Sequence, residues 1–232
     1  MTNADQMRKV RNLLKKAEAE GVTEPEAEAF RAKAFELAAK YEISAAEAMA
    51  GGKGEREKVI DTKFPVVLPT IQMLNLVNTV SRNSGCSMLR LGKEVAHVFG
   101  HESDLERFKM LWASVVVQGE RACASSYTGP GGRLYRRYRR SWWENYNYAI
   151  SGRMAAARAA AKSASTVVGT DIALRDKSKA VDDAIAGTYT RLGNGRRQPG
   201  TRSGDGAMEG YQAGMRADLG GSSVGGGHKE LS

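Results

Sequence analysis

The stretch that decides how this chain is built is residues 133–143, Arg-Leu-Tyr-Arg-Arg-Tyr-Arg-Arg-Ser-Trp-Trp. Aromatic residues recur from here at intervals of three and four, which places them along one side of a helix. The stripe consists of Tyr135, Tyr138, Trp142, Tyr146 and, at its end, Ala149. We expect this stripe to pack in the core, on a helix that covers residues 133–165.

The arginines of this helix fall largely on another side. Five arginines occur within eight residues without an acidic neighbour, which is more than solubility requires. Like charges four residues apart also destabilise a helix, by roughly 0.2–0.5 kcal/mol per pair. We therefore expect an anionic partner, which is either a nucleic acid or an acidic protein surface. The candidate contact residues are Arg133, Arg136, Arg137, Arg139, Arg140 and Trp143, together with Arg196 and Arg197 in a later loop.

The positive charge of the chain is concentrated in one third of its length. The chain has 232 residues and a formal net charge of +9. Residues 133–203 contain 15 Lys/Arg against five Asp/Glu, whereas residues 1–60 contain 11 of each. No stretch approaches the ~20 apolar residues of a membrane span, and the N-terminus lacks the features of a signal peptide. Together with only two cysteines, this predicts a cytoplasmic protein that does not engage a membrane.

The whole chain, including this helix, divides into four parts. The N-terminal part pairs two amphipathic helices, and capping boxes at Thr23 and Ser44 start the second helix and a short third one. Beyond a glycine-rich break, short strands are expected at 57–67, 87–91, 94–100 and 171–174, among longer helical stretches. The predicted fold class is therefore α+β and mostly helical, with a small β-sheet. The expected parts are 1–50, a helical hairpin plus short third helix; 51–56, a linker; 57–192, an α+β body; and 193–232, a Gly-rich basic loop, short helix and flexible tail.

The apolar side of the N-terminal hairpin is a second candidate contact surface. Two helices joined by a short turn bury little area alone, so this side must pack on the rest of the chain or on a partner. We interpret it as a protein-docking element. Its residues are Leu13, Leu14, Phe30, Leu37 and Tyr41.

Residues that could carry chemistry are few. The chain lacks a P-loop, and neither cysteine has a CxxC partner. His97 and His101 are four apart, but on a strand this spacing separates them by ~13 Å, too far for one metal ion. We predict no cofactor, no metal ligands and no catalytic residues. A hydrolase that uses His97, His101 and Cys86 is the enzymatic alternative.

Two segments of the hairpin resemble a known family. Residues 7–18, Met-Arg-Lys-Val-Arg-Asn-Leu-Leu-Lys-Lys-Ala-Glu, and residues 26–43 resemble domain-of-unknown-function family 2786, a helical hairpin of bacterial and bacteriophage proteins. Residues 138–146 and 206–214 resemble the region that accompanies this hairpin in phage members. The family offers no catalytic residues to carry over.

The resemblance implies a class of function rather than a mechanism. Basic phage proteins of this type and length are similar to the recombination directionality factors of actinobacterial phages. Such a factor binds a DNA-bound large serine integrase and switches it from integration to excision without chemistry of its own. The implied partners are the integrase and DNA, contacted directly or through the integrase, in the cytoplasm of a bacterial host. Besides the hydrolase, the second alternative to a directionality factor is an autonomous nucleic-acid-binding protein.

Overall fold

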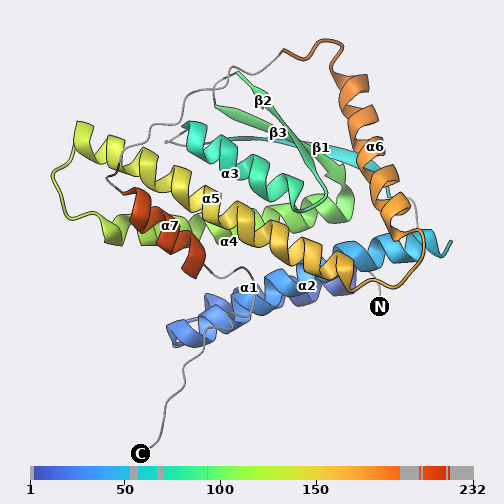
Figure 1. The fold of residues 1–232 in the computed structure, drawn as a ribbon, viewed down its shortest axis with the longest axis horizontal. Helices are drawn as coiled ribbons and strands as arrows, with labels where there is room; N and C mark the ends of the chain where they lie inside the picture. The colour runs from blue at the N-terminus through green and yellow to red at the C-terminus, as the bar shows by residue number, and fades with distance from the viewer. Residues whose placement is uncertain are drawn as a thin grey trace, which may run out of the picture.

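The computed structural model describes residues 3–52, 57–66, 70–92, 94–193, 204, 206–217 and 219. These residues form seven helices and one three-stranded sheet, so the predicted α+β, mostly helical fold is confirmed (Figure 1). None of the described helices is both long and apolar enough to cross a membrane. The elements in chain order are α1 (Asn3–Ala17), α2 (Glu24–Ala50), β1 (Val59–Pro65), α3 (Thr70–Arg82), β2 (Ser87–Leu91), β3 (Val95–His101), α4 (Glu102–Ser126), α5 (Arg133–Ser163), α6 (Thr170–Thr188) and α7 (Ala207–Arg216).

The sheet has the order β1-β3-β2, and β3 pairs antiparallel with both neighbours. Side chains alternate across β3, as the two-residue period of a strand requires. Ala96 and Val98 join the main core with α3 and α4, whereas Phe99 packs with Val181 and Ile185 of α6. Helices therefore cover both faces of the sheet, with α6 on the side opposite α3 and α4.

Helix α5 runs across the front of the molecule in Figure 1, and α7 lies along it. The aromatic stripe of α5 packs in the core as predicted, because Trp142 and Tyr146 are buried and their rings stack at 5.0 Å. The Tyr146 hydroxyl donates a hydrogen bond to the carbonyl oxygen of Val115 in α4. Helix α5 is thus fixed on its inner side by α4 and α7.

The N-terminal hairpin packs on the body of the protein. Helices α1 and α2 contact each other, and α2 also contacts α5 and α6. Val10 and Phe35 belong to the same core cluster as Val98 of the sheet. The capping box at the start of α2 is present, and the Thr23 backbone N–H donates to the Glu26 carboxylate at 3.0 Å.

The short third helix predicted to start at Ser44 is wrong, because α2 continues without a break to Ala50. Ala38, Glu42 and Ala46 are buried at a spacing of four, so the packed side of α2 runs through this position. A capping-box sequence starts a helix only where the preceding residues leave the helical conformation, and here tertiary packing holds them in it.

The strand predicted at 171–174 is also wrong, since these residues form the first turns of α6. Ala173, Lys177, Val181 and Ile185 are buried at a spacing of four, and this helical side covers the sheet. The predicted linker lies largely outside the described residues, which include only its Gly51 and Gly52, in a turn.

Candidate functional site

An exposed arginine face on α5 is the first candidate site. The side chains of Arg133, Arg136, Arg137 and Arg140 are all exposed. Within the part of the chain that the structure describes, none of the four forms an ion pair with a carboxylate. We call these four residues the arginine face. It presents four guanidinium groups on a helix whose opposite side is anchored in the core, so the charges are held on a rigid support.

Two other predicted contact residues of α5, Arg139 and Trp143, contact α4 of this chain. Arg139 turns toward α4, where its guanidinium donates to the Glu120 carboxylate at 2.5 Å. Trp143 is 0% exposed and packs against Gly119 of α4, so its proposed contact with a partner is corrected to a core position. Helical geometry explains this, because residue 143 lies on the side that meets α4. Arg196 and Arg197 lie outside the described residues.

The hairpin residues predicted to dock a partner lie against this chain's own core. Leu13, Leu14 and Leu37 are half-buried and pack against the core cluster, and Tyr41 is buried within it. Phe30 is half-buried, with the Lys16 ammonium 5.8 Å from its ring centroid. The structure therefore places four of these five residues in or against the core cluster that hairpin and body share.

The histidines on β3 are engaged in hydrogen bonds. His97 lies between Asp61 and Tyr189, with its Nε2 2.7 Å from the carboxylate and its Nδ1 2.7 Å from the hydroxyl. His101 lies between two backbone carbonyl oxygens, those of Glu57 and Lys177. Among the described residues, no group of three or more His, Cys, Asp or Glu is placed to hold a metal ion.

Cys86 lies apart from both histidines. Its Sγ packs close to Gly100, on the side of the sheet that faces α3 and α4, and the thiol is buried. Burial, with a smaller effect from the Asp104 carboxylate, raises the pKa of the Cys86 thiol. A thiol with a raised pKa stays protonated near neutral pH and is a poor nucleophile.

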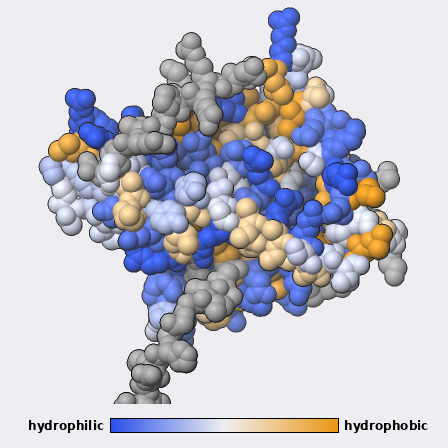
Figure 2. Space-filling model, viewed as in Figure 1, coloured by the Kyte–Doolittle hydropathy of each residue, from blue (hydrophilic) through white to orange (hydrophobic). Residues whose placement is uncertain are grey.

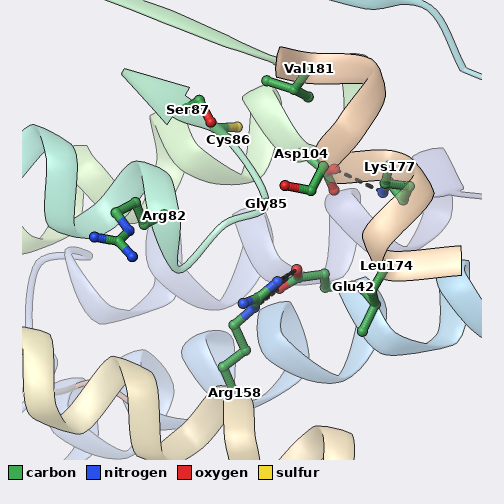
Figure 3. A pocket seen from close by; sticks show the side chains of 11 residues that line it. Glu42, Arg82, Gly85, Cys86, Ser87, Asp104, Arg158, Leu174, Lys177 and Val181 are labelled. Carbon is green, nitrogen blue, oxygen red and sulfur yellow. Dashed lines mark hydrogen bonds and ion pairs between the residues drawn. The ribbon is translucent and has the colours of Figure 1, made fainter. Parts of the chain in front are cut away.

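A small cavity beside Cys86 is a site that the sequence analysis did not anticipate. Its volume is about 220 Å³, and its lining comes from α2, α3, α4, α5 and α6. Figure 3 shows Glu42 and Arg158 on one side and Asp104 with Lys177 on another. Arg158 donates to both oxygens of the Glu42 carboxylate, with a closest contact of 2.6 Å.

Asp104 is the centre of the second group of charges in this cavity. It is 1% exposed, and its two oxygens contact Arg107 at 2.5 Å and Lys177 at 2.8 Å. These ion pairs join α2 to α5 and α4 to α6, and removing one partner of a buried ion pair is strongly destabilising. We therefore assign this cluster a structural role. Asp104 and Arg107 are neighbours three residues apart on α4, but Lys177 and Arg158 come from distant parts of the sequence, so no local pattern predicts their pairing with Asp104 and Glu42.

The protein has a mostly helical α+β fold with an arginine-rich helix, α5, at its surface. The N-terminal helical hairpin packs on the body that contains α5. The model of a protein family of unknown function, DUF2786, matches residues 7–45, which correspond to most of α1 and α2. The resemblance of the hairpin to this family is thereby supported over that segment. No curated protein and no solved structure matches the chain.

Proposed function

We propose that this protein is a non-catalytic accessory factor that binds an anionic partner through the arginine face of α5. The observation that carries the proposal is that four exposed guanidinium groups lie on one anchored helix without a carboxylate partner in the described chain. Arg133 and Arg137, like Arg136 and Arg140, repel each other across one helical turn. A bound anionic surface would offset this repulsion.

The residues named in the hydrolase alternative, Cys86, His97 and His101, are not arranged as the cysteine–histidine pair that it would use. His97 and His101 each have both ring nitrogens in hydrogen bonds within the chain. Cys86 lies on the other side of the sheet from His97, and its raised pKa disfavours the thiolate. In the described structure the Cys86 thiol donates to the carbonyl oxygen of Ser84 and is not paired with either histidine, whereas a cysteine nucleophile requires an adjacent base.

The specific partner we propose is a large serine integrase bound to DNA, which the factor switches from integration to excision. This part of the proposal rests on the resemblance of the hairpin and of residues 138–146 to phage proteins. Such a switch requires that the factor bind one synaptic state of the integrase more tightly than the other, by a few kcal/mol, roughly what a large population shift needs. The second candidate function is autonomous nucleic-acid binding, which the same exposed arginines favour.

A gel-shift titration with duplex DNA at several salt concentrations, with and without integrase on its sites, separates the two functions. The accessory factor should shift only the integrase–DNA complex and should promote recombination of the excision site pair. An autonomous binder should shift bare DNA, with a log–log salt slope of about −0.9 per phosphate neutralised. If integrase reactions on both site pairs stay unchanged, the proposed role is wrong.

A matched pair of variants assigns the effect to the arginine face. The triple variant Arg136→Gln, Arg137→Gln, Arg140→Gln should lose most of the shift. The control Arg8→Gln, Lys33→Gln, Lys179→Gln removes the same charge from exposed ion pairs elsewhere, which contribute little to stability. Equal loss in both triples would mean that net charge alone governs binding.

A further inference from the structure

Four large exposed side chains gather where α5 and α7 lie side by side. Tyr148 of α5 is 72% exposed, and Met208, Tyr211 and Met215 of α7 are 63%, 39% and 47% exposed. The rings of Tyr148 and Tyr211 are in contact, with centroids 6.3 Å apart. Met208 and Met215 lie three residues before and four residues after Tyr211, so all three share one side of α7. We call these four residues the Tyr–Met patch.

The fold does not need these side chains for its own packing. Helix α7 is attached to α5 by its opposite side, where Gly210 and Gly214 approach the backbone of Trp142 and Tyr146. Figure 2 shows the face with α5 and α7 in front, where hydrophobic side chains lie as separate patches in a largely hydrophilic surface. Tyrosine, methionine and arginine are the residue types enriched in the contact regions of protein–protein interfaces.

The charge beside the Tyr–Met patch identifies the partner's chemistry. Arg137 and Tyr148 are eleven residues apart, which places them on the same side of α5 at a distance of about 16 Å along the axis. Arg140 adds a second positive charge near Arg137. Glu144, which follows Arg140 by four residues and precedes Tyr148 by four, is half-buried. A phosphate backbone would use the arginines but leave the tyrosines and methionines exposed. An acidic, amphipathic protein segment would use both.

We propose that the Tyr–Met patch and the neighbouring Arg137 and Arg140 form the docking surface for an amphipathic segment of a protein partner, with an apolar stripe flanked by Asp or Glu. The inference rests on the proposed function and names the surface that contacts the partner. The segment's apolar side chains would cover the exposed tyrosine rings and methionine side chains. Its carboxylates would pair with the guanidinium groups.

The test compares two double variants in binding to purified large serine integrase on its DNA sites. Tyr148→Ser with Tyr211→Ser should weaken binding at least tenfold. The control Val168→Ser with Ile172→Ser removes side chains that are 93% and 59% exposed near the start of α6, and it should change binding less than twofold. Unfolding midpoints of both variants should match that of the wild type, because none of these residues is buried.

A photo-crosslinking residue at position 148, with position 172 as control, then identifies the contacted segment. Capture of an integrase segment rich in Asp or Glu beside apolar residues supports the proposal. Wild-type affinity in the tyrosine double variant overturns the docking surface but leaves the accessory role intact. Failure of the wild type to bind integrase at all overturns both. Crosslinks to a second copy of this chain would overturn the proposal and make the Tyr–Met patch a self-association surface. An equal loss of binding to bare DNA in the tyrosine double variant would overturn the proposal and make the patch a DNA-binding surface.

Discussion

The five arginines between residues 133 and 140 have two different roles, although they are the same residue type on one helix. Arg139 pairs with Glu120 of α4 and helps to fix α5, whereas the other four are exposed. Arg139 lies one helical turn before Trp143, where its side chain reaches Glu120 of α4. Arginines that are close together in the sequence therefore do not all make the same kind of contact.

Asp104 provides a prediction at the scale of single residues. Asp104→Asn removes the carboxylate that pairs with both Arg107 and Lys177 in the interior, and it should lower the free energy of unfolding by about 3–5 kcal/mol. Chemical denaturation followed by circular dichroism measures this. Asp183→Asn removes the partner of an exposed lysine on α6 and should cost less than about 1 kcal/mol. Similar costs for the two variants would contradict the structural role of the buried cluster.

At the scale of elements, α7 is held by a stripe of small residues. Gly206, Gly210 and Gly214 recur every four residues and face α5, where added Cβ atoms would overlap Tyr138, Trp142 and Tyr146. The spacing is visible in the sequence, but by itself it predicts only a short helix. Its meaning depends on the large aromatic residues that α5 places opposite.

Gly210→Ala tests this contact between elements. A methyl group there would meet the carbonyl group of Trp142, so the two helices must separate, which should cost about 1–3 kcal/mol. The fluorescence of the tryptophans should also change, because Trp142 loses its cover. Gly152→Ala lies on an exposed position of α5 with open space around it, and it should stabilise the protein by about 0.5–1 kcal/mol. A neutral Gly210→Ala would mean that α7 does not pack as described.

At the scale of the whole molecule, the hairpin and the body share one core. Met7, Val10 and Phe35 of the hairpin belong to the cluster that contains Trp142 and Val98. The ion pair between Glu42 and Arg158 adds a second connection between them. The two parts should therefore unfold together, although the hairpin alone matches a family model.

Phe35→Ala measures this coupling. All three tryptophans, Trp112, Trp142 and Trp143, lie in the body, so their fluorescence reports the body alone. Removing the buried ring in α2 should lower the stability recorded by tryptophan fluorescence by about 3–5 kcal/mol. Glu36→Gln, an exposed change one residue away, should leave it nearly unchanged. A shift in circular dichroism without a shift in fluorescence would show an independent hairpin.

The sequence by itself determined the elements whose pattern is local. Capping residues, helical spacing and short β-rich runs predicted the hairpin, the long basic helix and three strands, because each signal acts within one or two turns of chain. The mostly helical α+β class followed from their order. The exposure of Arg136, Arg137 and Arg140 also followed, since the aromatic residues of α5 had to face inward.

Tertiary structure alone decided where those elements meet. It buried Trp143, continued α2 past Ser44, and made residues 171–174 helical, because packed surfaces override local propensity. It also paired Glu42 with Arg158 and Tyr148 with Tyr211, whose partners are distant in sequence. Contacts across such distances depend on the register of packed helices, which a single sequence does not encode in any local pattern.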